Sequence, residues 1–219
     1  MISASFLALV HNALIHNAAL LVAVAFIFDV VAIRWRPGQA SFMQVPVGLA
    51  LGSIGITVML TPWIFMPGIL FDTRSVLLGV SGLFFESLPT AVAMAMTAAF
   101  RFYQRGAGTL AGVVVILTSG TIGIAWRHFH RRSLSEISWC ELYLFGIVIH
   151  IVILVIIMFT LPWETALRVL SNITLPVLVI HPLATALLGT LMVNRLRREQ
   201  TEETLRKSKQ VLRSLNAGR

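Results

Sequence analysis

Charged residues are missing from long stretches of this 219-residue sequence. Residues 37–71, 106–126, 142–163 and 169–194 contain no Asp, Glu, Lys or Arg. Each stretch is at least as long as the roughly 20 apolar residues that a helix needs to cross about 30 Å of hydrocarbon. With 57% hydrophobic and 12% charged residues, the chain has too much apolar surface for a single water-soluble core. The sequence therefore predicts a polytopic, all-α membrane helix bundle whose first partner is the lipid bilayer.

Groups that carry covalent or metal chemistry are also scarce. The one cysteine, Cys140, excludes an intramolecular disulfide and a CxxC metal site. No HExxH pattern, Cys/His cluster, nucleophile elbow, P-loop or dinucleotide fingerprint occurs. We therefore expect no metal, no cofactor and no enzymatic activity in this chain, because a membrane-embedded enzyme would need a clustered acid/base or metal set.

The six histidines are scattered along the sequence. His128 and His130 stand in a basic loop, while His150 and His181 are each alone in an apolar stretch. An interhelical hydrogen bond is the ordinary role of a histidine in such a stretch, and a proton relay or a pH sensor is the alternative.

Positive charge is concentrated at the C-terminus. The net charge is +8, and residues 195–219 hold eight Lys or Arg against three Glu. A basic segment directly after a membrane span predicts a cytoplasmic anchor, so we expect no nucleic-acid partner. We divide the chain into a transmembrane domain, 1–194, and a cytoplasmic amphipathic helix, 195–219. The N-terminus lacks the basic region of a removable signal peptide, so the first apolar run is expected to be retained.

Six hydrophobic segments follow from the apolar runs and from the polar, Pro and Gly residues between them. They are 7–33, 47–65, 75–101, 106–126, 142–163 and 172–194. The third segment is interrupted at Glu86-Ser87-Leu88-Pro89, and we predict that it turns back there as a broken or re-entrant segment. That topology places thirteen basic residues on the cytoplasmic side and four outside, which the positive-inside rule prefers over six full crossings.

Glu86 is a carboxylate in an otherwise uncharged stretch. A carboxylate at the centre of a membrane helix costs roughly 2.5–3.5 kcal/mol on insertion scales, so it normally faces a cavity or a partner. A broken helix also exposes backbone groups that are tolerated only beside protein or water. Two interpretations stay open: Glu86 belongs to a buried site, or the break at Pro89 lifts it to the membrane interface.

Asp72 and Arg74 lie two residues apart on the approach to the broken segment. They predict either a local ion pair that clamps a loop or a site where Arg74 presents its planar donor fork to an anionic ligand. Small residues four apart, Gly48 with Gly52 and Gly108 with Gly112, are typical of closely packed membrane helices.

These elements together resemble the transmembrane input domain of the LytS/YhcK type, the five-transmembrane receptor (5TMR-LYT) family of bacterial sensor histidine kinases and diguanylate cyclases. The resemblance is carried by Pro67-Gly68, Phe71-Asp72-Thr73-Arg74-Ser75, Gly82-Leu83-Phe84-Phe85, an arginine at the end of an aromatic helix, and a Gly-rich helix that ends in Arg127. One departure is the pair Glu86-Ser87, which stands where the family pattern has Gly-Pro.

The resemblance implies roles for particular residues. Ligand or signal sensing is assigned to Asp72, Arg74, Glu86 and Arg101, and the structural motif to Pro67, Gly68, Gly82, Pro89, Gly108 and Gly112. It further implies a plasma-membrane receptor that senses a small ligand or a membrane state. Its output would pass to a cytoplasmic domain or a response regulator, in a two-component phosphorelay that includes cell-wall regulation, or in cyclic-dinucleotide synthesis.

Leu205, Leu212 and Leu215 fall with Ser208 at three- and four-residue steps in the C-terminal helix. This seam resembles the transmitter helix that leads into a PAS-type or kinase module, and it predicts a homodimer and a chain that is the membrane half of a longer protein or a product cut short. A basic helix lying on the lipid surface is the other interpretation. A small-molecule permease or a transporter substrate-binding subunit is the alternative function, and it has no use for such a helix.

Overall fold

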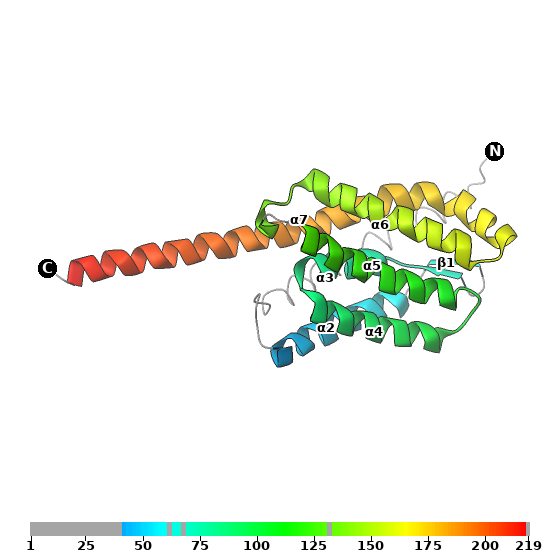
Figure 1. The fold of residues 1–219 in the computed structure, drawn as a ribbon, viewed down its shortest axis with the longest axis horizontal. Helices are drawn as coiled ribbons and strands as arrows, with labels where there is room; N and C mark the ends of the chain where they lie inside the picture. Colours follow the sequence, from blue (N-terminus) through cyan, green and yellow to red (C-terminus); the bar gives the residue numbers. More distant parts are fainter. Residues whose placement is uncertain (1–40, 61–62, 67–68, 131–132, 218–219) are drawn as a thin grey trace, which may run out of the picture.

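The computed structural model describes residues 41–60, 63–66, 69–130 and 133–217 (Figure 1). The predicted first span, 7–33, and the motif residues Pro67 and Gly68 lie outside the described residues. The elements in chain order are α2 (Ser41–Leu60), β1 (Trp63–Met66), β2 (Ile69–Phe71), α3 (Arg74–Phe84), α4 (Ser87–Gln104), α5 (Thr109–Phe129), η1 (Leu134–Glu136), α6 (Trp139–Thr160) and α7 (Trp163–Ala217). The predicted all-α membrane bundle is confirmed, with one short antiparallel hairpin added to it.

The helices run roughly along one axis, and α7 continues far beyond the others at one end (Figure 1). We call that end of the bundle the tail end and the opposite end the hairpin end, because strand β1 lies toward it (Figure 1). The closest neighbours are α6 with α7, α2 with α4, and α3 with α5. The core therefore consists of three helix pairs, and α3 lies in its interior, with all of its residues buried.

Three described helices, α5, α6 and the membrane part of α7, are long and apolar enough to cross a bilayer. The 22 residues of α6 span about 33 Å at 1.5 Å per residue, which matches the hydrocarbon thickness. Exposed aromatic residues mark both ends of the bundle, with Phe129 and Trp139 at the tail end and Tyr103, Phe159 and Trp163 at the hairpin end. Such aromatic belts are typical of the two membrane interfaces.

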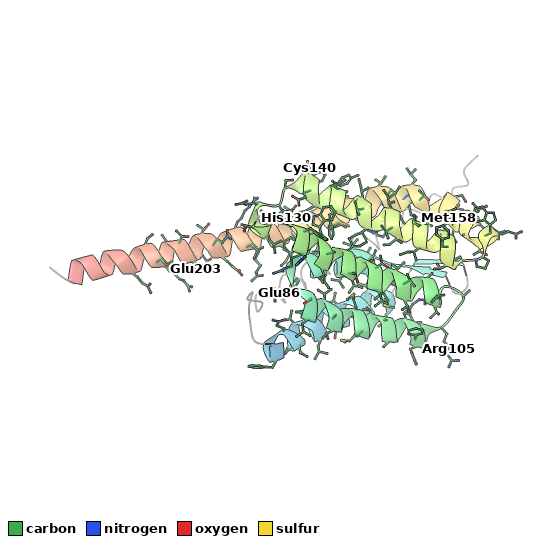
Figure 2. The ribbon with its side chains drawn as sticks, viewed as in Figure 1. Glu86, Arg105, His130, Cys140, Met158 and Glu203 are labelled. Carbon is green, nitrogen blue, oxygen red and sulfur yellow. The ribbon has the colours of Figure 1, made fainter. Side chains whose placement is uncertain are left out.

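The predicted break in the third segment is confirmed. α3 ends at Phe84 and α4 begins at Ser87, so the chain turns back at Glu86 at the tail end (Figures 1 and 2). Glu86 has φ 72° and ψ 178°, a region that is almost restricted to glycine. Pro89 is tolerated because it stands in the first turn of α4, where a backbone N–H has no intrahelical acceptor.

Two predicted boundaries were wrong. Residues 63–66 and 69–71 pair as antiparallel strands in place of the end of a helix and a loop, with Trp63 opposite Phe71. α7 begins at Trp163 rather than at residue 172, because the buried residues Ala166, Val169 and Ile173 keep a helical spacing through a part of the sequence that also carries charge. The charged side chains there point outward, so they do not end the helix.

Glycines bring α3 and α5 into backbone contact. A Cβ added to Gly82 would lie 2.6 Å from the Gly120 carbonyl oxygen and 2.7 Å from the Ile124 nitrogen. Gly79 and Gly123 make the equivalent contact one turn away. Close backbone approach through small residues replaces the hydrophobic driving force that is missing between helices in lipid, and here it holds the short helix α3 inside the bundle.

Candidate functional site

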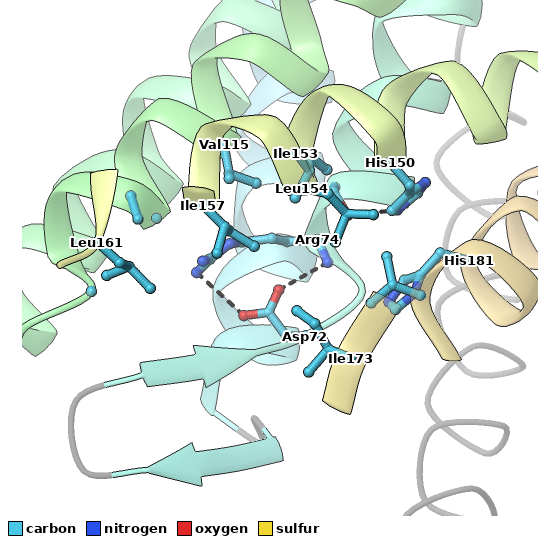
Figure 3. A pocket seen from close by; sticks show the side chains of 15 residues that line it. Asp72, Arg74, Val115, His150, Ile153, Leu154, Ile157, Leu161, Ile173 and His181 are labelled. Atoms are coloured by element: carbon cyan, nitrogen blue, oxygen red, sulfur yellow. Dashed lines mark hydrogen bonds and ion pairs between the residues drawn. The ribbon is translucent and has the colours of Figure 1, made fainter. Parts of the chain in front are cut away.

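A cavity of about 70 Å³ lies in the bundle interior, toward the hairpin end (Figure 3). It is enclosed by the loop after β2, the first turn of α3, and parts of α5, α6 and α7. Gly108 and Leu161, which flank α5 and α6 at the hairpin end, also line it. One water needs roughly 10–15 Å³ on this measure, so the cavity has room for several waters or for a small polyatomic ligand.

Asp72 and Arg74 form a buried ion pair on the cavity wall (Figure 3). Arg74 Nη1 lies 3.2 Å from Asp72 Oδ2, and the side chains are 6% and 3% exposed, respectively. The backbone N–H of Arg74 also donates to Asp72 Oδ1 at 3.0 Å. Neither Arg74 Nη1 nor Asp72 Oδ2 makes a well-oriented hydrogen bond. The guanidinium is thus fixed by Asp72 and still has donor capacity toward the cavity.

The N-terminus of α3 adds to the positive potential at this place. Arg74 is the first residue of α3; its backbone N–H already donates to Asp72 Oδ1, while the preceding Thr73 makes no side-chain capping hydrogen bond. The first backbone N–H groups of a helix have no intrahelical acceptor and carry the positive end of the helix dipole. A half-helix whose N-terminus faces a cavity is a recurrent way to bind an anion inside a membrane protein.

His150, Ser75 and His181 form the polar wall next to this ion pair. His150 is 1% exposed, and its Nε2 lies 3.3 Å from the Ser75 hydroxyl, while its Nδ1 lies 2.7 Å from the Gly146 carbonyl oxygen. The rings of His150 and His181 are stacked, with centroids 4.8 Å apart. Gly146 lets α6 and α7 approach closely here. A Cβ at this position would lie only 2.7 Å from Pro182 Cα.

Arg101 lies behind the cavity, between α4 and α5. It is 1% exposed, and its Nη1 lies 3.4 Å from Gln104 Oε1. A Cβ on Gly112 would lie 2.6 Å from Arg101 Nε, so this glycine is needed for the buried guanidinium to fit. Arg101 is also close enough to Arg74 and Asp72 to interact with them electrostatically. Three of the four predicted sensing residues therefore gather around one place.

Glu86, the fourth, lies at the opposite end of α3, about 16 Å away along the helix. Its carboxylate is 27% exposed and lies 3.4 Å from Arg127 Nη2 and 3.5 Å from Gln44 Nε2. Arg127 Nη1 also donates to the carbonyl oxygens of Phe84 and Leu83 at 3.0 Å and 3.4 Å. The structure thus places Glu86 in a polar cluster that caps the C-terminus of α3, away from the cavity.

The strained backbone at Glu86 gives a testable prediction. Glu86→Gly and Glu86→Ala both remove the contact with Arg127, but only glycine relaxes the positive φ. We therefore expect Glu86→Gly to be more stable than Glu86→Ala by about 1–2 kcal/mol. Reversible unfolding of the two variants in mixed detergent micelles measures this difference, and equal stabilities would show that the turn carries no strain.

Sequence reasoning treated His150 and His181 as separate residues and did not single out Ser75. The sequence feature that could have indicated a tight α6–α7 approach is Gly146, a small residue four positions before His150, which the structure shows in close contact with α7. We call the part of α7 that projects beyond the other helices the free part of α7 (Figure 1). Leu205 lies on it and is 54% exposed, whereas the side chains of Leu212 and Leu215 lie outside the described residues. Within the described part of the chain, no group of three or more His, Cys, Asp or Glu could hold a metal ion.

Comparison with known proteins agrees with this architecture. Residues 25–195 match the family model described as 5TMR of 5TMR-LYT. No curated protein and no solved structure matches the chain. The match covers more than half of the sequence, including α2 to α6 and the membrane part of α7. The chain therefore belongs to the 5TMR-LYT family and carries the transmembrane sensing domain of a signal-transduction receptor.

Proposed function

We propose that this chain is the input domain of a bacterial plasma-membrane receptor that binds a small anion between Arg74 and the N-terminus of α3. The observation that carries the proposal is the buried Arg74 guanidinium on the cavity wall, which carries five N–H donors and contacts the Asp72 carboxylate through Nη1. Water-sized and small anionic groups fit this space. Asp72 balances the formal charge of Arg74, so an anion is favoured by the remaining guanidinium donors, by the N-terminus of α3 and by the buried Arg101 nearby.

The signal leaves the site through α7. Ile173, Val177 and His181 line the cavity, and the same helix continues without interruption to Ala217. Near the point where α7 leaves the bundle, Arg197 Nε donates to the Ser135 carbonyl oxygen of η1 at 2.7 Å. A ligand that binds two arrangements of α7 unequally shifts their populations, and the continuous helix, which contains Pro176 and Pro182, carries the difference to its far end.

The receptor is a homodimer, and its cytoplasmic tail leads to a histidine-kinase phosphorelay that regulates the cell wall or to a diguanylate cyclase. The free part of α7 supports this assignment, because it projects beyond the bundle along the axis of the spans (Figure 1). The same membrane architecture would suit a permease or a transporter subunit. Anion uptake into proteoliposomes by the full chain, at a rate above that of empty liposomes, would favour that alternative.

Insertions into the C-terminal part of α7 test whether the signal is transmitted along this helix. We join a histidine-kinase module after Arg219 and insert either one or seven residues after Glu203, beyond the Arg197 contact. One residue rotates the downstream helix by about 100°, whereas seven residues return it to within about 20° of the original direction. We expect the one-residue insertion to change basal kinase activity at least tenfold and the seven-residue insertion to leave it within about twofold. Identical behaviour of both insertions would contradict transmission through α7.

A further inference from the structure

The hydrogen bonds of His150 fix its tautomer. Nδ1 lies 2.7 Å from the Gly146 carbonyl oxygen, which only accepts, so Nδ1 carries a hydrogen. In the neutral imidazole, Nε2 is then the acceptor. Its partner at 3.3 Å is the hydroxyl of Ser75, which must therefore donate its single hydrogen to the ring. In this state Ser75 has no hydrogen left for a ligand in the cavity.

Protonation of His150 would reverse this bond. With hydrogens on both nitrogens, Nε2 becomes a donor and the Ser75 oxygen becomes the acceptor. The hydroxyl hydrogen of Ser75 is then free to turn toward the cavity, which both Ser75 and His150 line. One added proton thus supplies a positive charge and a new hydrogen-bond donor to the same small space.

The charged and titratable groups around His150 make protonation depend on a bound anion. Three basic groups lie near His150: Arg74 of α3, His181 of α7 and, further away, Arg101 of α4. The arginines are positive, and His181 becomes positive if it takes up a proton. Asp72 is the one carboxylate among the residues that line the described cavity. The lining residues of α5 carry no titratable side chain. Asp72 already pairs with Arg74, so an imidazolium needs a second negative charge nearby.

We propose that anion binding at the Arg74 site takes up one proton, which is held on His150, and that Ser75 then donates its hydroxyl hydrogen to the anion. This inference rests on the proposed anion-binding function and adds its regulation by pH. The proton comes from water, it forms an N–H bond at Nε2, and no other covalent bond changes. Stacking against His181 at 4.8 Å limits the pair to one proton, because two imidazolium rings at that distance repel each other.

Thermodynamic linkage between proton and anion binding fixes how strongly the anion affinity depends on pH. If the anion raises the affinity for the proton, the proton raises the affinity for the anion by the same factor. Where His150 is neutral in the empty site and protonated in the complex, uptake of one proton per anion makes binding about tenfold tighter for each pH unit of acidification. The receptor would then respond to acid and anion together, rather than to the anion concentration alone.

Calorimetry of the full chain in lipid nanodiscs tests the proposal, with acetate as the probe anion. Titrations at pH 5.5, 6.5 and 7.5, each in two buffers of different ionisation enthalpy, give both the affinity and the number of protons taken up. We expect the wild-type chain to take up about one proton per acetate and to bind about tenfold more tightly per unit of lower pH. His150→Gln should lose this pH dependence, and Ser75→Ala should bind more weakly while it keeps the proton uptake.

His128→Gln is the matched control, because His128 is exposed at the tail end and does not line the cavity. It should behave as the wild type does. Acetate binding without proton uptake in the wild type would overturn the proton coupling and leave the anion site intact. Proton uptake that survives His150→Gln but not His181→Gln would also overturn the assignment. Absence of acetate binding at all three pH values would refute the anion site and the coupling with it.

Discussion

Replacement of Arg74 by alanine is expected to lower the free energy of unfolding by about 3–5 kcal/mol. The cause is the carboxylate that the substitution leaves behind, since Asp72 is 3% exposed and is paired with Arg74 at 3.2 Å. A buried carboxylate without a counter-ion must remain charged at high cost or take up a proton. Reversible unfolding in mixed detergent micelles measures the loss.

The double substitution Asp72→Ala/Arg74→Ala separates the two roles of the pair. It removes both charges, so most of the stability lost in Arg74→Ala should return. The response to a small anion should be lost in both variants, because each removes the only guanidinium that lines the described cavity. A double variant that folds and still responds would show that Asp72 and Arg74 are a structural clamp and nothing more.

Replacement of Gly82 by alanine is expected to cost about 3 kcal/mol, at the upper end of the usual range for overpacking. The new methyl group would lie within 2.9 Å of three backbone atoms of α5, and backbone atoms cannot move unless the two helices separate. Because α3 carries Arg74 and Ser75 at its N-terminus, its displacement should also weaken anion binding.

Gly52→Ala provides the matched control for this substitution. Gly52 is equally buried, but its added methyl group would chiefly meet the sulfur of Met96 at 2.5 Å, at the flexible part of that side chain. We expect a cost of about 1 kcal/mol, well below that of Gly82→Ala, because a rotamer change of Met96 moves the sulfur away and leaves only its Cβ, at 3.0 Å, to adjust. Equal losses for Gly52→Ala and Gly82→Ala in the same unfolding assay would argue against a rigid α3–α5 backbone contact.

The sequence alone predicted the membrane bundle and the break at Glu86. These two predictions succeeded because each depends on a local property, whereas the sensing role of the residues that the family resemblance marked stays a prediction. An uncharged stretch of about 20 residues predicts a span whatever its neighbours are, and Pro89 beside a carboxylate interrupts a helix by its own chemistry. The resemblance to the receptor family marked Asp72, Arg74 and Arg101, which the structure then brings together.

The start of α7 and the hairpin were missed because neither depends on a local property of the sequence alone. Absence of charge was used to locate the spans, yet the first turns of α7 carry Glu164 and Arg168 on an exposed face while Ala166 and Val169 are buried. The pairing of β1 with β2 depends on contacts between the strands, which short apolar runs do not reveal.

The tertiary structure decided which polar residues share a site. His150 and His181 are 31 positions apart and meet because α6 and α7 are antiparallel neighbours in close contact at Gly146 and Pro182. Glu86 and Arg74, only 12 positions apart, are separated by the whole length of α3. Local chemistry in the sequence therefore determined what each segment is and where the chain can turn. The distances between segments come from helix packing, which depends on the fit of side chains far apart in the sequence.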